Sequence, residues 1–420
     1  MIMGKLSNLA ETMVGSEIVR LGNEISERKR KGENIFNFTI GDFDPEIFPI
    51  PKELEEYIIE SYEKHFTNYP PAEGVIELRI AVSQFLKEWE GLEYTPNEIL
   101  IACGGRPLIY ALFKSVVNAN DKVIYAVPSW NNNHYTNLHH GQHCVIETCQ
   151  QNNFMPTADD ILKHIKDAAL ICLCTPQNPT GTTLTSETLS EICRLIIDEN
   201  NKRDGHQKKL YLMFDQMYWT LTYGGIKHHN PVSIDPQMRE YTIFIDGISK
   251  AFAATGVRVG WAFGPQDVVA KMKAFLSHIG AWAPMAEQKA TAKYLTGKTS
   301  LQNHFTEFKA ALELRLHEIY EGLMALKSKG FNVDAVAPQA AIYLTVKFDL
   351  VGKQTSGGKL NSQSDVTAYL LNEAHLAVVP FYAFGAGKQS PWYRLSVGTC
   401  KTQEIIPFLK HLEMALEKLK

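Results

Sequence analysis

The clearest chemistry in this sequence lies in one twelve-residue string, Ser249–Gly260, which reads Ser-Lys-Ala-Phe-Ala-Ala-Thr-Gly-Val-Arg-Val-Gly. Lys250 follows a short apolar run and has mostly apolar neighbours in the chain. Desolvation lowers the pKa of a lysine, and the neutral amine can then attack a carbonyl group. Arg258 offers a planar donor fork that suits a phosphate. The alternative, a surface lysine and a structural arginine, would suffice for Ser249-Lys250 alone but not for the whole string.

An aspartate closes another apolar run, Leu210–Phe214. Burying the carboxylate of Asp215 is costly unless it meets a cation, and a protonated pyridine nitrogen is such a cation. A ring held in that protonated form acts as an electron sink. Tyr218 follows three residues later and can donate a hydrogen bond to a phenolic oxygen. The alternative for Asp215 alone is a cap on the next turn.

Two further segments combine turn residues with groups that could bind a ligand. Thr175–Gly181 is first of all a turn, because of its proline and glycine residues, but Asn178 within it could bond a phenolic oxygen and a substrate carboxylate. Gly104-Gly105-Arg106 precedes a predicted helix. Two glycines let the backbone approach a phosphate, and the helix N-terminus presents free N–H groups to it.

Two large side chains complete the candidate set. Trp130, after a strand that ends at Pro128, could stack on a flat ring, although a tryptophan is more often part of a core. Arg394 lies in the otherwise apolar run Trp392–Val397 and therefore needs an anion. A substrate carboxylate would suit it bidentately, and a structural ion pair is the equal alternative.

The elements that must position these residues alternate in the manner of an α/β protein. From about residue 96, apolar runs such as Ala168–Cys174 alternate with helical patterns such as Ser186–Glu199. This rhythm predicts a mostly parallel sheet between helices, with ligands at the carboxyl ends of its strands. A polar loop is expected over 200–209. The C-terminal part, with one long helix near Met285–Lys329 and then mixed strands and helices, predicts a smaller α+β domain.

We therefore expect three segments: residues 1–50, an N-terminal segment that belongs to the small domain; residues 51–300, the large domain; and residues 301–420, the small C-terminal domain. A chain of 420 residues is long enough for this arrangement.

Composition narrows the function classes. The formal net charge is −4 and 21% of residues are charged, which argues against nucleic-acid or membrane-surface binding. No apolar stretch reaches the length of a spanning helix, and the N-terminus lacks a signal-peptide pattern. Seven cysteines without C-x-x-C pairs indicate reduced core thiols and no metal site. We expect a cytoplasmic protein.

Taken together, these motifs resemble the class I aminotransferases of fold type I, which use pyridoxal 5′-phosphate (PLP), and most of all the aspartate aminotransferase-like branch. The resemblance runs from Ile40–Asp44 through Asn68–Gly74 to Arg394. It implies a large domain built on a mostly parallel seven-stranded sheet and a homodimer with shared active sites. It implies that Lys250 forms the internal Schiff base. It also implies that PLP is bound by Tyr69 (from the neighbouring subunit), Gly105, Arg106, Trp130, Asn178, Asp215, Tyr218, Ser249 and Arg258, and that substrate is bound by Gly41, Trp130, Asn178 and Arg394.

The reaction implied is a ping-pong transamination between an L-amino acid and a 2-oxo acid, with Lys250 moving the Cα proton. The donor would be aspartate or glutamate, or a broader set that includes neutral or aromatic amino acids. The segment His278–Pro284 lies near the partner's active site in the family, and here it carries Trp282 and no arginine. A dicarboxylate preference therefore does not follow from the family.

Three alternatives can be weighed from the sequence. A β- or γ-lyase or a cyclopropane-forming synthase would keep PLP and change the reaction. An amino-acid-sensing regulator would need a DNA-binding module, which we do not expect. A nucleotide-binding dehydrogenase would need a G-x-G-x-x-G turn at the first strand, and that turn is lacking.

Overall fold

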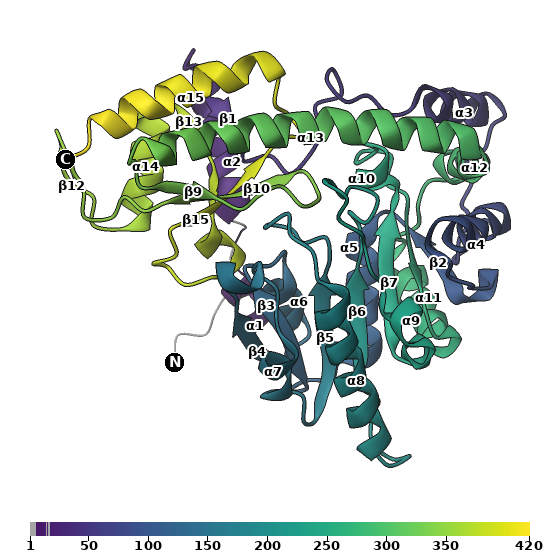
Figure 1. Ribbon diagram of the computed structural model, residues 1–420. Coiled ribbons are helices and arrows are strands. Elements are labelled where there is room, and N and C mark those ends of the chain that lie inside the picture. Colours follow the sequence, from purple (N-terminus) through teal and green to yellow (C-terminus); the bar gives the residue numbers. More distant parts are fainter. Residues whose placement is uncertain (1–5, 14, 16) are drawn as a thin grey trace.

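The computed structural model describes residues 6–13, 15 and 17–420, and its larger part is built on a seven-stranded sheet (Figure 1). The strand order is β2-β8-β7-β6-β5-β3-β4, and only β8 runs antiparallel to its neighbours. The sheet is therefore mostly parallel, as predicted. Its strands are β2 (Ile99–Ala102), β3 (Lys122–Val127), β4 (Gln142–Glu147), β5 (Ala168–Cys174), β6 (Tyr211–Asp215), β7 (Thr242–Gly247) and β8 (Gly260–Phe263).

Both faces of this sheet are covered, which explains the near-continuous apolar character of its strands. Successive residues of β5 alternate between two apolar cores: Ile171 belongs to one and Leu170 to the other. The first core is closed by α4 (Ile76–Glu90), α8 (Ser186–Lys202) and α12 (Met285–Leu295), and the second by α5 (Gly105–Val116) and α11 (Gln266–Ile279). Helix α3 (Lys52–Glu63) packs on α12. Shorter helices are α6 (Asn132–Leu138), α7 (Ala158–Leu162), α9 (Pro231–Ile234) and α10 (Ile248–Ala251).

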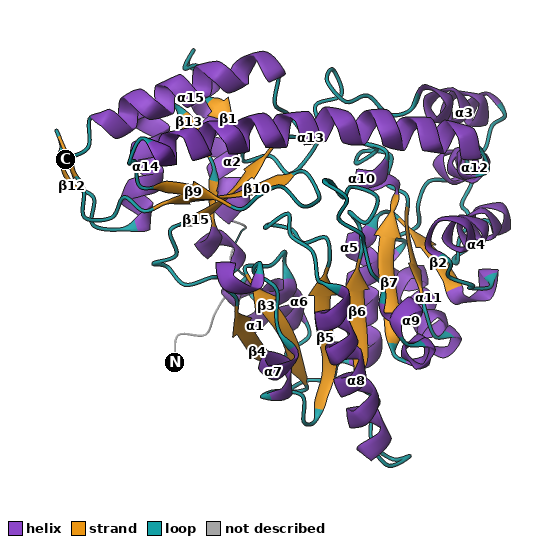
Figure 2. Cartoon of the chain, in the orientation of Figure 1, coloured by secondary structure: helices purple, strands orange, loops and turns teal. Residues whose placement is uncertain are grey.

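A second, smaller unit has its own sheet and core, separate from the first in Figure 2. Its antiparallel sheet has the order β14-β15-β10-β9. The N-terminal strand β1 pairs in parallel with β13, so the two ends of the chain meet in this unit. Its elements are β1 (Phe36–Asn37), β9 (Val333–Ala335), β10 (Tyr343–Phe348), β13 (Leu376–Ala377), β14 (Val379–Pro380), β15 (Trp392–Ser396), α2 (Glu17–Arg30), α14 (Gln363–Glu373) and α15 (Thr402–Glu417). A small hairpin, β11 (Gln354–Thr355) and β12 (Gly358–Lys359), and the short helix α1 (Asn8–Thr12) complete the list. We propose the division 1–50, 51–300 and 301–420, with α13 shared between the two cores.

One helix joins the two units. Helix α13 (Lys298–Ser328) runs along most of the width of the molecule in Figure 1. Its Phe305 belongs to a core of the large sheet, whereas Phe308 belongs to the core of the small unit. The prediction of a single helix from Met285 was wrong, because α12 ends at Leu295 and Gly297 has φ −87° and ψ 73°, outside the helical region. Glycine is a poor helix former, so a break there is inexpensive.

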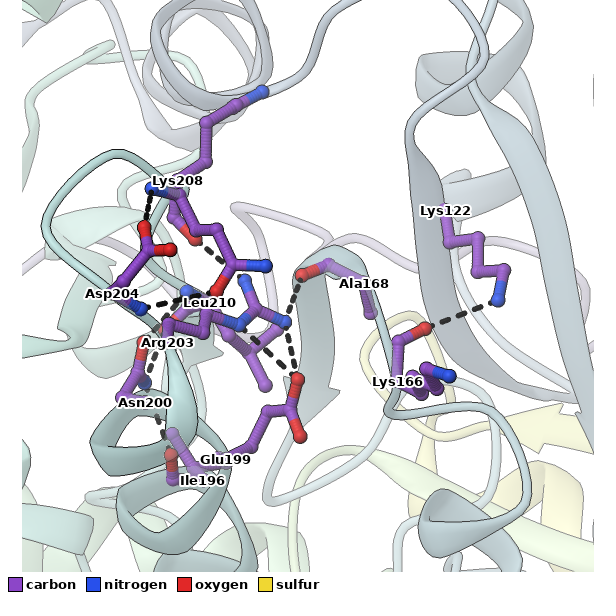
Figure 3. A network of polar contacts seen from close by, with 11 residues as sticks. Lys122, Lys166, Ala168, Ile196, Glu199, Asn200, Arg203, Asp204, Lys208 and Leu210 are labelled. Carbon is purple, nitrogen blue, oxygen red and sulfur yellow. Dashed lines mark hydrogen bonds and ion pairs between the residues drawn. The ribbon is translucent and has the colours of Figure 1, made fainter.

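The polar segment after α8 is held by a compact network (Figure 3). The Arg203 guanidinium donates to a Glu199 carboxylate oxygen at 2.9 Å and to the Ala168 carbonyl at 2.9 Å. Asn200 exchanges two hydrogen bonds with the backbone of Leu210. The segment is therefore fastened to the starts of β5 and β6, and the helix extends to Lys202 where the sequence predicted a loop from residue 200.

Candidate active site

Eleven of the twelve predicted site residues line one cavity of about 750 Å³. It opens at the carboxyl ends of the parallel strands, where the sequence placed it. The eleven residues are Gly41, Gly105, Arg106, Trp130, Asn178, Asp215, Tyr218, Ser249, Lys250, Arg258 and Arg394. The twelfth, Tyr69, lies elsewhere.

Lys250 sits on the four-residue helix α10, which begins directly after β7. Its Nζ donates to the Gly41 carbonyl at 2.7 Å. Burial lowers the pKa of Lys250 to about 8, although the Asp42 carboxylate acts in the opposite direction. A substantial fraction of this amine is thus neutral near pH 8, and the neutral form is the nucleophile and the base.

Asp215 ends β6 and lines the cavity. Part of its side chain is open to the cavity, and one oxygen accepts from the Met217 backbone N–H at 3.1 Å. Burial raises the pKa of Asp215 to about 6. No cation of the described residues forms an ion pair with it, so its natural complement is a cation brought by a ligand.

The turn after β2 forms a cradle for an anion. Gly104 has φ +90°, and a Cβ atom there would lie 2.2 Å from Nη2 of Arg258. The Arg258 guanidinium donates to the carbonyls of Cys103 at 2.8 Å and Thr255 at 2.7 Å. Arg258 itself has φ +65°, a strained conformation for a side chain of this size. These bonds hold the arginine beside the N-terminus of α5, which presents free N–H groups.

Arg394 is 1% exposed on β15. Its guanidinium donates to the Asn178 side-chain oxygen at 3.1 Å and to the Thr39 carbonyl at 2.7 Å, and its Nε has no partner. Burial lowers the pKa of Arg394. None of the described carboxylates pairs with it, so the structural ion pair considered for this residue is absent from that part of the chain.

Tyr343 is a site residue that the sequence reasoning missed. Its hydroxyl lies 2.6 Å from that of Tyr218, and its ring lies 4.7 Å from Cζ of Arg394. A Cβ atom at Gly41 would lie 2.9 Å from the same hydroxyl. Tyr343 begins a strand with no polar motif around it; only its pairing with the strand of Arg394 could have indicated its place. Ile18 and Gly22 of α2 also line the cavity and were missed.

The mouth of the cavity combines an arginine and an indole. The Arg106 guanidinium lies 5.2 Å from the ring centre of Trp130. Arg106 is exposed, and among the described residues its side chain forms no ion pair or hydrogen bond. It is therefore available to a ligand's anionic group.

Tyr69 and Trp282 lie together on the surface, away from this cavity. Tyr69 is 82% exposed, and the two rings pack edge to face with their centres 5.4 Å apart. Both line a separate hollow that contains none of the other predicted site residues. Within one chain, Tyr69 therefore does not join the other site residues.

The residues of the cavity suit PLP on three counts. Asp215 is a carboxylate without a cation, which a protonated ring nitrogen would supply. The glycine turn, the α5 N-terminus and Arg258 form an anion cradle that a side chain at position 104 would fill. Lys250 offers an amine with a lowered pKa at the same cavity.

Comparison with known proteins decides the family. The profile described as "Aminotransferase class I and II" matches residues 33–412. The chain belongs to the class I and II aminotransferases. This aminotransferase is 30% identical over 383 residues to an aspartate aminotransferase of Bacillus sp. (strain YM-2), covering 91% of this chain and 92% of that one.

Solved structures agree on the fold. The aspartate aminotransferase of Rhizobium meliloti matches this aminotransferase with a TM-score of 0.89 and 24% identity, over 99% of this chain and 100% of that one, a likeness of fold alone. The aspartate aminotransferase of Thermus thermophilus with maleate matches with a TM-score of 0.87 and 26% identity, over 99% and 100% of the two chains.

The protein is thus a PLP-dependent enzyme of fold type I that transfers amino groups between amino acids and 2-oxo acids. The lyase and synthase alternatives gain no support from these relatives. In the part of the chain that the structure describes, no helix combines the length and the apolarity needed to cross a membrane.

Proposed function

We propose that this aminotransferase uses dicarboxylic amino donors, aspartate or glutamate. The observation that carries the proposal is a pair of arginines at one cavity. Arg394 in its depth and Arg106 at its mouth both lack a carboxylate partner among the described residues. Two such cations suit a substrate with two carboxylates, one at Cα and one on its side chain. A solved relative is described with maleate, which is a dicarboxylate.

We propose the following roles for the cavity residues. Lys250 holds PLP, Asp215 pairs with its ring nitrogen, Tyr218 and Asn178 reach its ring oxygen, and Trp130 stacks on the ring. The backbone of Gly105 and Arg106, the Ser249 hydroxyl and Arg258 hold the phosphate. Arg394, Gly41, Asn178 and Trp130 bind the substrate, and the side chain of Arg106 takes the distal carboxylate.

When bound, PLP supplies an electron sink for the charge that develops at the substrate Cα. The chain supplies the rest. Lys250 Nζ, with its pKa near 8, takes the Cα proton and returns it. Asp215 keeps a positive charge on the ring favourable, and Arg394 fixes the α-carboxylate so that the Cα–H bond faces Lys250.

The donor preference is tested by the absorption band of the bound cofactor, followed in rapid mixing with aspartate, glutamate, alanine and phenylalanine. The dicarboxylates should convert the band fastest. Arg106→Met should lower kcat/KM for aspartate by roughly 10- to 150-fold, because it removes a hydrogen bond to a charged group. The kcat/KM for alanine, which has no distal carboxylate, should stay unchanged. Lys114→Met, which removes an exposed cation from the same helix α5 outside the cavity, is the control. Faster conversion by phenylalanine would contradict the proposal and favour aromatic donors.

We also propose a homodimer in which Tyr69 completes the neighbouring active site. The support is the exposure of Tyr69 and its distance from the cavity of its own chain. Mixing Tyr69→Ala with Lys250→Ala subunits would create one intact site in each hybrid dimer and restore activity. Light scattering that shows a monomer, or mixtures no more active than the separate variants, would contradict it. We place the enzyme in the cytoplasm, in keeping with its seven unpaired cysteines.

A further inference from the structure

A second cavity, of about 970 Å³, shares no lining residue with the catalytic one. One wall is a face of α13 from Gln302 to Glu313, and the others are the C-terminal end of α4, the start of α8 and the segment Trp219–Ile234. We call this cavity the junction groove. It contains none of the residues assigned to transamination above.

The junction groove lies where the chain passes from one core to the other. On α13 the change from the core of the large sheet to the core of the small unit falls between Phe305 and Phe308. On the opposite wall it falls between Trp219, which packs on the sheet core, and Leu221, which belongs to the core of the small unit. A ligand in the groove would therefore touch segments anchored in both units.

Glu90 lies in the wall of the groove and forms no ion pair among the described residues. The Glu90 carboxylate accepts from the Gln216 side-chain amide at 2.7 Å through one oxygen, and its other oxygen has no partner. Burial and then the neighbouring Asp246 carboxylate raise the pKa of Glu90. Trp89 and Trp219 line the groove beside it. A carboxyl group with a free oxygen next to indole rings is suited to an ammonium group.

Lys309 lies one helical turn after Phe305 in the wall of the groove, and Glu313, one turn further along α13, also lines it. Lys309 is partly buried in the wall, and among the described residues it has neither an ion pair nor a hydrogen bond. Burial lowers the pKa of Lys309, and the nearby Glu313 carboxylate acts in the opposite direction without forming an ion pair with it. Phe305, four residues before it on α13, touches Trp89 with ring centres 5.2 Å apart. The lysine and Glu90 thus share the groove without pairing with each other.

Several buried side-chain N and O atoms of the junction groove have no hydrogen-bond partner among the described residues. Of the 19 buried side-chain N and O atoms without a partner among the described residues, five belong to residues of the groove. They are Trp89 Nε1, Glu90 Oε2, Thr220 Oγ1 and both ring nitrogens of His228. Thr220 is 8% exposed. Burial lowers the pKa of His228 to about 3, so its ring is neutral and offers one donor and one acceptor. Such groups are normally satisfied by water or by a ligand.

We propose that the junction groove is a second ligand site for a small amino-acid zwitterion, with its ammonium group at Glu90 and its carboxylate toward Lys309. The hydroxyl of Thr220 and the ring of His228 supply further hydrogen bonds. Such a ligand would contact segments anchored in both units, and residues of both units also line the catalytic cavity. This site is independent of the donor preference proposed above.

The test uses the holoenzyme and probes that lack an α-amino acid group. The probes are β-alanine, 4-aminobutanoate and 5-aminopentanoate, which carry the two charges at increasing separations; acetate and ethylamine carry one charge each. Calorimetry measures binding, and the cofactor absorption band reports any entry into the catalytic cavity. At least one zwitterion should bind with a Kd in the millimolar range and leave the band unchanged, while acetate and ethylamine should bind at least about tenfold more weakly.

Three variants assign the binding to the groove. Glu90→Gln and Lys309→Met should each raise the Kd of the tightest-binding probe by about tenfold or more. Glu88→Gln, a substitution in the same last turn of α4 at a surface ion pair with Lys298, should leave it unchanged. Thr220→Val removes an unpartnered hydroxyl without changing charge, and it should weaken binding even if the charge variants fold poorly.

The proposal is overturned if no zwitterion binds at concentrations up to about 50 mM, well above the millimolar Kd that we expect. It is equally overturned if acetate or ethylamine binds as tightly as the zwitterions, or if Glu90→Gln and Thr220→Val both leave the Kd unchanged. The first outcome would mean that the groove binds no zwitterion, the second that it does not require both charges, and the third that the binding lies elsewhere.

Discussion

The catalytic cavity and the junction groove both contain buried charges without partners, but the charges are arranged differently. In the catalytic cavity, Arg394 lies within β15 and Asp215 ends β6, and both are held by hydrogen bonds to the backbone. In the groove, Glu90 and Lys309 come from helices of the two walls and have few polar contacts. The first arrangement is preorganised for chemistry, because its groups cannot relax toward each other. The second holds separated charges near a junction, which suits binding rather than catalysis.

The difference teaches why similar pKa shifts mean different things in this molecule. Burial raises the pKa of Asp215 to about 6 and that of Asp246 to about 7. The Asp246 carboxylate accepts hydrogen bonds from the Trp219 indole N–H at 2.9 Å and from the Gly247 backbone N–H at 2.7 Å. Asp215 faces an open cavity and has one such bond. A perturbed carboxyl indicates a functional site only where a ligand can reach it.

The largest expected effect separates the two partly buried lysines. Lys250→Ala should reduce turnover by about 10⁴-fold or more, because it removes the nucleophile and the general base together. Lys309→Ala should leave kcat/KM within about twofold, since its side chain lies outside the catalytic cavity. Steady-state rates with aspartate measure both. Unaltered turnover in Lys250→Ala would refute the central assignment, and a large loss in Lys309→Ala would erase the distinction between the two cavities.

A smaller effect separates the two aspartates. Asp215→Asn should reduce kcat by roughly 100-fold, because the amide cannot stabilise a positive ring nitrogen. Asp246→Asn should change kcat by less than about fivefold, since the amide oxygen can still accept from Trp219. The cofactor spectrum as a function of pH supplies a second readout: the ring nitrogen should lose its proton at lower pH only in Asp215→Asn. An equal loss in both variants would make Asp246 part of the catalytic charge network.

The sequence predicted the catalytic cavity far better than the groove, for a physical reason. Asn178, Asp215 and Lys250 each follow an apolar run, and parallel strands bring their carboxyl ends together, so local patterns sufficed. Tyr343 reaches the cavity only through the pairing of β10 with β15, which no local pattern encodes. The walls of the groove come from α4, α8 and α13, and no motif links them.

The break after α12 shows the same limit on a smaller scale. The stretch Met285–Lys329 has a strong helical pattern and contains two glycines, Gly297 and Gly322, which are weak signals against it. Only Gly297 lies at the break, whereas Gly322 lies inside α13. What decides the break is the need for α13 to run from the sheet core to the second core, which is a tertiary requirement. The functional residues at the ends of strands could therefore be predicted from this sequence, whereas the junctions between the two units could not.

The pH dependence of cofactor loading sharpens the comparison for Lys250. Its pKa in the folded protein is about 8, below the ordinary value of 10.5. The neutral amine reacts, so the rate at which the cofactor-free enzyme regains its absorption band should rise with pH and level off above pH 8. The neutral fraction grows from about 1% at pH 6 to about 90% at pH 9. A rate that still rises steeply between pH 9 and 10 would show that burial does not depress this pKa.

The smallest effect concerns the stability contribution of Glu90. Its pKa is raised in the folded protein above the ordinary 4.5, so above pH 4.5 the folded state binds more protons than the unfolded state. By linkage, stability then falls as pH rises from 4.5 toward the raised pKa. Glu90→Gln cannot ionise, and its amide oxygen can still accept from Gln216. The variant should therefore match the wild type at pH 4.5 and exceed its Tm by about 1–3 °C at pH 8, measured by calorimetry. Glu88→Gln, at an exposed position on the same helix, should show no such pH-dependent gain. If the Glu90→Gln difference does not grow with pH, the carboxylate already has a counter-charge, and the argument for an ammonium ligand in the groove loses its basis.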